Sequence, residues 1–147
     1  MSETVRVTVT RQDRYRFVVD FGPGIEAALG DEPAPLGEGA GPSPSQLLAA
    51  AVANCLSSSL VFAVNKYKED PGRLTTAVTC EVGRNDKGRL RILGMAVEMT
   101  LGAEPETLGH LERALASFEE FCTVSQSVRA GIPFTVSVRA PDGRVLK

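Results

Sequence analysis

Two segments near the N-terminus alternate apolar with polar residues, which is the pattern of strands that bury one face. Residues 5–9 alternate valine with polar side chains, and residues 15–21 form a second β-like run after the polar stretch 11–14. These segments predict a β-hairpin. Residues 22–44 are rich in Gly, Pro, Asp and Glu, so we expect one short strand there and otherwise irregular chain.

The longest apolar segment carries signals for the start and the end of a helix. Ser43 can cap a helix whose first residue is Pro44, because proline lacks only an N–H group that the first turn leaves unused. The pair Pro71 and Gly72 stops it, so the pattern predicts a helix over residues 43–69. Alanine and serine dominate its surface and let neighbouring segments approach from more than one side. We therefore expect this helix at the centre of the fold.

Two strand-like segments follow, over residues 74–83 and 90–101. The sequence Asn-Asp-Lys-Gly at residues 85–88 suits a tight turn, so the two segments predict a second β-hairpin. Alternate residues of the first strand share one face, which we expect to point into the core: Leu74, Thr76, Val78, Cys80 and Val82.

The C-terminal part predicts two more helices and a last strand. Residues 103–121 place leucines and a phenylalanine three and four positions apart, which is typical of an amphipathic helix. A short helix is expected over residues 123–129, and residues 134–138 alternate as a strand. Strands and helices in this order predict an α+β fold, with largely antiparallel sheet packed against helices.

Composition and charge narrow the possible functions. The 147 residues, 43% of them apolar, support one domain over residues 1–147: N-terminal strands and loop (1–42), central helix (43–69), and the remaining strands and helices (74–147). Sixteen basic and eighteen acidic residues, without a basic run, make nucleic acid an unexpected partner. The chain starts without the pattern of a secretion signal, and Asn54 and serines interrupt the apolar segment. We expect a cytoplasmic protein with no membrane span.

Three cysteines are the candidates for chemistry. Cys55 lies in the alanine-rich helix, where a cysteine is most often a small core residue. Cys122 lies between two predicted helices, where free N–H groups could stabilise a thiolate or where the side chain could simply fill an apolar corner. Cys80 shares a strand face with valines, which favours core packing.

The sequence indicates neither a metal site nor a nucleotide cofactor. His110 is the only histidine, it lies on a polar helix face where we expect it to be solvated, and the cysteines lack the close spacing of zinc ligands. The glycines of residues 37–41 lack the spacing of a phosphate-binding loop.

Two motifs together resemble a known family. Residues 41–55 (GPSPSQLLAAAVANC) and 121–127 (FCTVSQS), preceded by Asp-Glu-Pro at 31–33, are similar to the two cysteine motifs of the OsmC/Ohr family of osmotically inducible and organic hydroperoxide resistance proteins. The likeness covers nearly the full chain. It implies an OsmC-like fold, with antiparallel sheets and a long central helix, in an intertwined homodimer with two sites at the subunit interface.

The resemblance also implies an activity, that of a thiol-dependent peroxidase. The first cysteine, Cys55, would be oxidised to a sulfenic acid by a small hydroperoxide substrate, and Cys122 would condense with it to a disulfide. A dithiol reductant would then restore both thiols. No bound cofactor or metal takes part in this cycle.

The chain departs from the family at one position that matters for this activity. Active members pair an arginine with a glutamate near the first cysteine, and the position of that glutamate is Ser45, which cannot form a bidentate ion pair. Arg11, Arg14 and Arg16 are the candidate arginines, and we select Arg14. The departure implies a slow peroxidase. Alternatively the dimer is non-catalytic and binds a small apolar ligand or senses oxidants, or the chain is an interaction module with three inert thiols.

Overall fold

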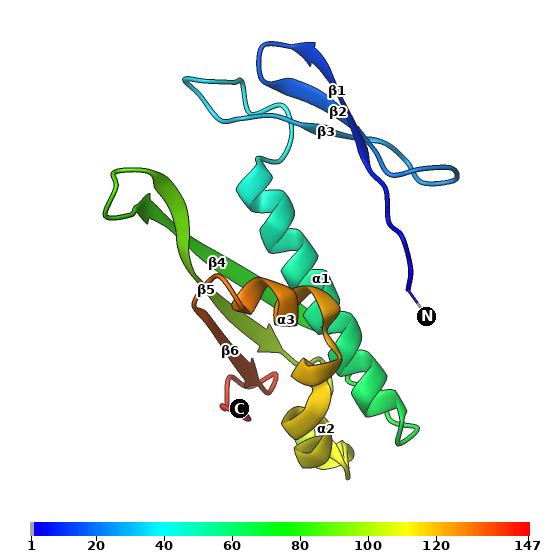
Figure 1. Cartoon of the computed structure of the whole chain (residues 1–147). Coiled ribbons are helices and arrows are strands. Elements are labelled where there is room, and N and C mark those ends of the chain that lie inside the picture. The colour runs from blue at the N-terminus through cyan, green and yellow to red at the C-terminus, as the bar shows by residue number, and fades with distance from the viewer. Residues whose placement is uncertain (1) are drawn as a thin grey trace. The chain divides into compact units, whose positions relative to one another are not determined.

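The computed structural model describes residues 2–147, which divide into two compact units between Leu48 and Ala49. The division falls inside the helix α1 (Pro44–Asn65), which is drawn in cyan to green in Figure 1. The positions of the two units relative to one another are not determined, so each is described by itself. The single domain expected over residues 1–147 stays a prediction.

The first unit contains a three-stranded antiparallel sheet in the order β1 (Thr8–Asp13), β2 (Arg16–Asp20) and β3 (Ala28–Gly30). The predicted N-terminal hairpin is therefore present, but its first strand is shifted and its turn lies at Arg14 and Tyr15. Arg14 has a φ of 44°, in the left-handed region that residues other than glycine seldom adopt. One short strand, β3, follows in the Gly- and Pro-rich segment, as predicted.

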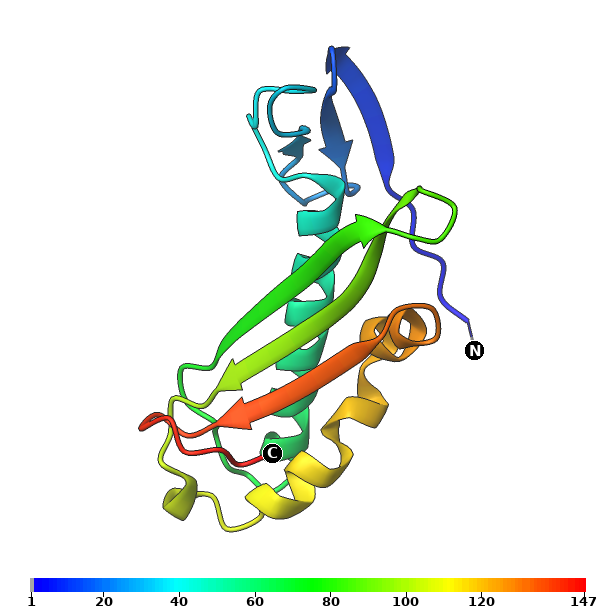
Figure 2. The same ribbon diagram turned by 90° about the vertical axis from the view of Figure 1, so that its left-hand side faces the viewer.

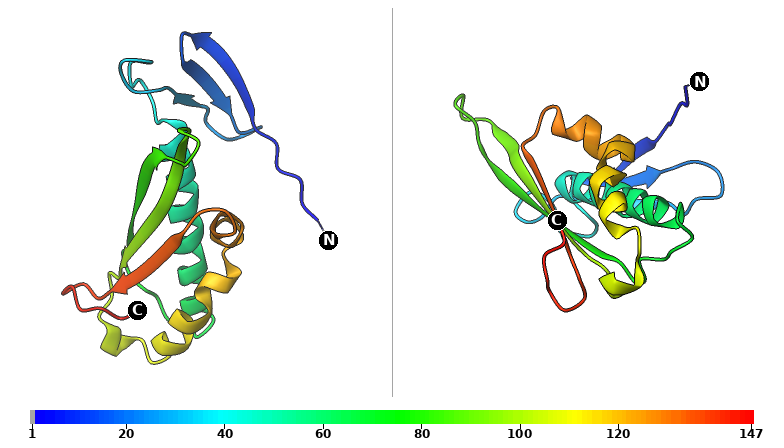
Figure 3. Two further views of the ribbon diagram at one scale, coloured as in Figure 1. Left: turned by 60° about the vertical axis from the view of Figure 1, so that its left-hand side comes forward. Right: turned by 90° about the horizontal axis from the view of Figure 1, so that it is seen from below.

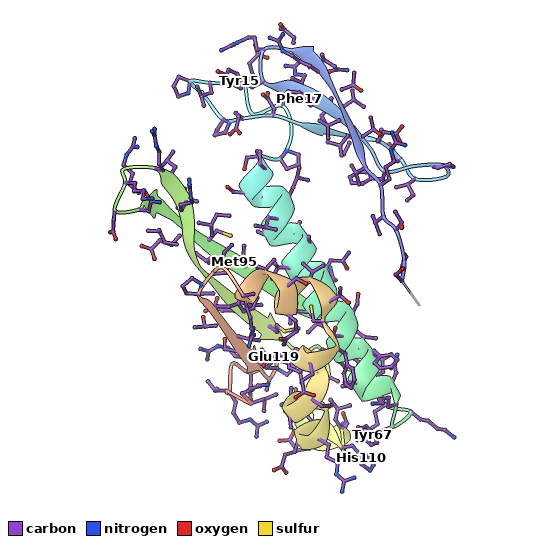
Figure 4. The ribbon with its side chains drawn as sticks, in the orientation of Figure 1. Tyr15, Phe17, Tyr67, Met95, His110 and Glu119 are labelled. Carbon is purple, nitrogen blue, oxygen red and sulfur yellow. The ribbon has the colours of Figure 1, made fainter. Side chains whose placement is uncertain are left out.

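One side of this sheet lines an open apolar hollow of about 470 Å³. Tyr15 and Phe17, labelled in Figure 4, contribute aromatic rings to it. Every residue of β1 is exposed. A sheet of three short strands leaves much of its apolar side uncovered, and few such sheets are stable without further packing.

The loop after β3 is organised by a buried aspartate. The side chain of Asp31 is 3% exposed, and its Oδ2 accepts hydrogen bonds from the backbone N–H groups of Ala40 (3.0 Å) and Glu38 (3.1 Å). These N–H groups, that of Ala40 first, outweigh the effect of burial and lower the pKa of Asp31. The loop is therefore ordered by its own backbone.

The start of α1 is the one that the sequence predicts. The backbone N–H of Gln46 donates to Ser43 Oγ (3.2 Å), and the backbone N–H of Ser43 donates to Gln46 Oε1 (2.9 Å), which is a capping box. The end differs from the prediction, because the helix stops at Asn65 rather than near residue 69. Lys68, with a φ of 60°, takes a left-handed conformation and ends the helical turns before Pro71 is reached.

Within its own unit, α1 buries one side rather than all of its surface. The buried residues recur at three- and four-residue spacing: Val52, Leu56, Ser59, Leu60, Ala63 and Val64. The opposite side is exposed and carries mostly small residues: Ala50, Ala51, Asn54, Ser58 and Phe62. α1 is long and apolar enough to cross a membrane, but core helices of soluble proteins share these properties, so the feature by itself indicates no membrane.

The sheet of the second unit contains β4 (Thr75–Arg84), β5 (Leu90–Thr100) and β6 (Phe134–Arg139) in this order. β4 and β5 form the predicted antiparallel hairpin, whereas β6 pairs with β5 in parallel. The sequence predicts a largely antiparallel sheet, and this parallel pair is the exception. The helical segment between β5 and β6 returns the chain to the edge of the sheet from which β5 runs. β6 therefore runs in the same direction as β5 (Figure 2).

The predicted inner face of β4 is interrupted by a β-bulge. Thr76, Val78 and Cys80 alternate as half-buried residues, and Cys80 lies opposite the buried Met95 of β5. The register shifts between Glu81 and Val82. The bulge turns Val82 outward, where it is 52% exposed, so its predicted place in the core is wrong.

The predicted helix over residues 103–121 is wrong in its continuity. The segment contains the 3₁₀ turn η1 (Pro105–Thr107), the helix α2 (Leu111–Ser117) and the 3₁₀ turn η2 (Phe118–Phe121). Pro105 and Gly109 flank the break, and both residues are poor helix formers. The next helix, α3 (Thr123–Arg129), has the predicted bounds.

The helices of the second unit lie on one side of its sheet. Viewed from below in Figure 3, α1, α2 and α3 all lie to the right of β4, β5 and β6. The layer between them is largely apolar and includes Leu56, Leu60, Val97, Met99, Phe118 and Val138. One polar pair also joins α1 to β4, the hydroxyls of Ser57 and Thr76, 2.6 Å apart. This core fixes α1 and the start of α3 in place, and these two elements carry two of the cysteines.

Candidate functional site

Cys55 and Cys122 are brought together by the fold. Cys55 lies on the fourth turn of α1, and Cys122 is the residue immediately before α3. The thiol of Cys122 lies near enough to the thiol of Cys55 to raise its pKa, and both thiols are free. Two sulfurs far apart in the sequence therefore share one site. A cysteine that only fills space in the core would not need a second thiol beside it.

Cys122 is held by the first turn of α3. Its side chain is fully buried, and its Sγ accepts a hydrogen bond from the backbone N–H of Ser125 (3.4 Å). This is the place of an N-cap, where an oxygen-bearing side chain is more common. The helix start therefore fixes the direction of the sulfur.

Cys55 is half-buried, and its surroundings act on its pKa in two directions. Burial raises the pKa of the thiol, and the hydrogen bond and charge of Cys122 raise it further. The backbone N–H groups of Val124 and Ser125 lower it, but the net effect is a raised pKa. In the described chain Cys55 is therefore a protonated thiol at neutral pH, with hydrogen-bond donors for a thiolate already in place.

An open hollow of about 350 Å³ lies beside Cys55. Ser58, Ser59, Phe62 and Phe121 line it together with Cys55. The rings of Phe62 and Phe121 meet edge to face with their centroids 6.0 Å apart, although both side chains are about half exposed. The hollow therefore offers an apolar wall next to a sulfur atom, as a small apolar molecule with one reactive polar group would need.

The segment before Cys122 is anchored by an ion-pair cluster that sequence reasoning missed. Glu119, labelled in Figure 4, pairs with Lys147 Nζ (2.5 Å) and Arg129 Nη2 (2.8 Å). Burial raises the pKa of Glu119, but the hydrogen bonds and charges of Lys147 and Arg129 outweigh burial and lower it. Lys147 is far away in sequence, so only the fold brings it to this carboxylate.

Cys80 and His110 lie outside this site. Cys80 is on β4 with its thiol half-buried, and burial raises its pKa. The sequence predicts that His110 is simply solvated, but its half-exposed ring also contacts two neighbours. Its ring stacks on Tyr67 (centroids 4.3 Å apart, 5° between planes), and its Nδ1 lies 2.9 Å from Glu69 Oε1, at the far end of α1 (Figure 4).

The candidate arginine, Arg14, belongs to the first unit, whereas both cysteines of the site belong to the second. Its Nη2 donates to the carbonyl oxygens of Leu36 (2.9 Å) and Pro35 (3.3 Å), and Nη1 lies 3.7 Å from Glu38 Oε1. Arg16 pairs with the same glutamate at 2.6 Å. The structure thus gives Arg14 a role in holding the loop after β3, and its role at Cys55 stays a prediction.

Comparison with known families identifies the chain from its sequence. The family described as OsmC-like protein matches residues 37–137, a stretch that includes all of α1, Cys55 and Cys122. The chain belongs to the OsmC-like family. The resemblance to this family that the sequence shows is thereby confirmed, and so is the α+β fold with its long helix. No curated protein matches this OsmC-like chain.

Solved structures support the same fold. An OsmC-like protein of unknown function from Vibrio cholerae is 21% identical, with 94% of this chain and 99% of that chain covered and a TM-score of 0.74. An organic hydroperoxide resistance protein OsmC from Legionella pneumophila is 22% identical (93% and 97% covered, TM-score 0.71). The organic hydroperoxide resistance protein OhrB of Bacillus subtilis is 19% identical (92% and 98% covered, TM-score 0.67).

Proposed function

We propose that this OsmC-like protein is a thiol-dependent peroxidase that reduces small organic hydroperoxides. The observation that carries the proposal is the meeting of the Cys55 and Cys122 thiols in one site. The apolar hollow beside Cys55 supports an organic rather than a purely inorganic peroxide. Structural neighbours that are named for hydroperoxide resistance support it further.

The first step forms a sulfenic acid on Cys55. The thiol loses its proton, and the thiolate attacks the distal oxygen of the hydroperoxide while the O–O bond breaks. An S–O bond forms, and the departing oxygen takes a proton to become an alcohol. The backbone N–H groups of Val124 and Ser125 favour the thiolate that this step requires.

The second step closes a disulfide and protects the enzyme. Cys122 attacks the Cys55 sulfur, the S–O bond breaks, and the oxygen leaves as water. Because the thiol of Cys122 lies near that of Cys55, the sulfenic acid can condense before a second peroxide oxidises it further. A dithiol reductant then returns both residues to thiols, as we expect in a reducing cytoplasm.

A homodimer is part of the proposal. Each unit leaves an apolar surface uncovered: the exposed side of α1 in the second and the hollow of about 470 Å³ in the first. A second copy of the chain would cover such surfaces, since apolar area on this scale usually marks an interface. We propose that Arg14 activates Cys55 within that dimer.

Oxidation with one equivalent of cumene hydroperoxide tests the proposal. The intact protein should lose two hydrogen atoms, and peptide mapping should find a bond between Cys55 and Cys122 with Cys80 still free. A dithiol reductant should then sustain turnover. A protein whose three thiols all survive this treatment would contradict the redox function and favour an interaction module.

The raised pKa of Cys55 favours a second candidate, an oxidant sensor that reacts once and does not turn over. In this reading the serine at position 45 leaves the activating arginine without its carboxylate partner. The variant Ser45→Glu should then increase the rate of Cys55 oxidation about tenfold, the effect of one charge-assisted hydrogen bond. Unchanged kinetics in Ser45→Glu would show that the missing carboxylate does not limit the rate.

A further inference from the structure

The hydroxyl of Ser125 is a buried polar group without a partner. Ser125 is fully buried, and its Oγ makes no hydrogen bond. Two further buried side-chain atoms among residues 2–147 share this property, and both belong to the first unit: Arg16 Nε and Asp31 Oδ1. Within the described second unit, Ser125 Oγ is therefore the one buried side-chain oxygen or nitrogen that lacks a partner.

This hydroxyl belongs to a residue whose backbone serves both sulfurs of the site. The N–H of Ser125 donates to Cys122 Sγ (3.4 Å). The N–H groups of Val124 and Ser125 also lie near enough to the Cys55 thiol to lower its pKa. A buried donor without a partner costs stability, because it has lost water and gained nothing. Such a group beside a reactive pair is explained when a partner arrives during the reaction.

We infer that Ser125 Oγ–H is the hydrogen-bond donor for the oxygen atom that a peroxide transfers to Cys55. The inference rests on the proposed function. In the reduced site the sulfurs carry no oxygen, so the hydroxyl has nothing to bond. When the thiolate attacks, a hydrogen bond from Ser125 to the transferred oxygen draws electron density from that oxygen and makes it a better electrophile, while the negative charge passes to the departing oxygen, which takes a proton.

The same hydrogen bond serves the second step. When Cys122 attacks the Cys55 sulfur, the S–O bond breaks and the oxygen departs as hydroxide, which takes a proton to become water. A donor to that oxygen stabilises the departing charge. Ser125 thus contributes to both steps, as a catalytic residue that touches the reacting oxygen and is idle in the reduced protein.

The variant Ser125→Ala separates this role from a structural one. Removing a hydroxyl without a partner should leave the thermal midpoint unchanged or raise it by about 2 to 4 °C. The single-turnover rate of Cys55 oxidation by one equivalent of cumene hydroperoxide should nevertheless fall about tenfold, the effect of one lost hydrogen bond. Ser125→Thr, which keeps the hydroxyl, should restore at least part of the rate.

Ser127→Ala is the matched control. Ser127 lies on the same helix, is exposed, and its hydroxyl donates to the Thr123 carbonyl (2.8 Å), so its loss should leave the rate of Cys55 oxidation unchanged. The inference is overturned if Ser125→Ala reacts at the wild-type rate. It is also overturned if the rate falls only together with the thermal midpoint, which is the behaviour of a structural serine.

The experiment also distinguishes this inference from the proposed function. Single-turnover oxidation needs neither a reductant nor repeated cycles. A wild-type protein that is oxidised at Cys55 without sustained turnover would contradict the peroxidase, yet slower oxidation of Ser125→Ala would still support the role of the hydroxyl. Sustained turnover with an unaffected Ser125→Ala would leave the peroxidase standing and remove the serine from it. A Cys55 that resists oxidation altogether would remove both.

Discussion

Two half-buried thiols of the same chain, Cys55 and Cys80, differ in their neighbours more than in their burial. Burial raises the pKa of both. Cys80 lies opposite Met95 in its sheet, whereas Cys55 has a second thiol and two backbone N–H groups near enough to act on its pKa. A buried thiol alone is an inert core residue, and chemistry requires the partner that can accept and resolve its oxidised form.

The largest expected effect separates these two cysteines directly. Cys55→Ser should lower the rate of hydroperoxide consumption more than about a hundredfold, to the uncatalysed background, because it removes the attacking sulfur. Cys80→Ser should retain the wild-type rate. Both variants are measured with cumene hydroperoxide and a dithiol reductant. Wild-type activity in Cys55→Ser would show that another residue attacks the hydroperoxide. Loss of activity in Cys80→Ser would show that Cys80 is also needed, against the proposed difference between the two thiols.

A second variant tests Cys122, the thiol proposed to form the disulfide with Cys55. Cys122→Ser should still form the sulfenic acid on Cys55 but cannot close the disulfide, so turnover should fall at least about tenfold as the sulfur overoxidises to the sulfinic acid. Mass spectrometry of the peptide that contains Cys55 follows this oxidation. A Cys122→Ser protein that keeps full turnover without overoxidation would mean that an external thiol resolves the sulfenic acid.

The pH dependence of the reaction should reveal the raised pKa of Cys55. A thiol whose pKa lies above the ordinary value holds its proton at neutral pH, and the thiolate fraction grows about tenfold for each pH unit below that pKa. The second-order rate constant with hydroperoxide should therefore keep rising from pH 6 to pH 9. A plateau that begins below pH 7 would show that a positive group, such as Arg14 in a dimer, activates the thiol.

Most of the fold could be predicted from local patterns. Ser43 and Pro44 predict the start of α1, and the Asn-Asp-Lys-Gly turn predicts the hairpin of β4 and β5. The errors fall where a single residue changes the course of an otherwise regular element. The bulge at Val82 and the break near Gly109 are examples, because the alternation and the helical spacing continue past both positions in the sequence.

The site was predictable only in part, since its two sulfurs come from motifs that can be recognised while their surroundings come from the fold. The partners of Glu119 illustrate this limit. Local sequence places an acidic side chain three residues before Cys122 without a partner beside it, but the fold brings Lys147 and Arg129 to this carboxylate, and they compensate its charge. Nothing in the spacing of these residues indicates the contact.

The smallest expected effect concerns how firmly each thiol is held. Cys80 sits in a hydrogen-bonded strand, whereas Cys122 depends on a short connection fixed by Glu119 and its two cations. Glu119→Gln should lower the free energy of unfolding by about 1 kcal/mol, since the hydrogen bonds are charge-assisted but partly accessible to solvent. Amide hydrogen exchange should increase in α3 and stay unchanged in β4.

The difference in unfolding free energy between wild type and Glu119→Gln should disappear in acid. This direction follows from the lowered pKa of Glu119. A carboxylate whose folded pKa lies below its unfolded value of about 4.5 contributes its full stability above that pH, and loses it as the pH falls through the folded pKa. Urea denaturation at pH 7 and at pH 3 measures the two limits.

The exposed neighbour Glu120 provides the control, and Glu120→Gln should leave the unfolding free energy and the exchange of α3 unaltered. Equal exchange in α3 for Glu119→Gln and wild type would mean that the apolar core, rather than the ion pairs, holds Cys122 against Cys55.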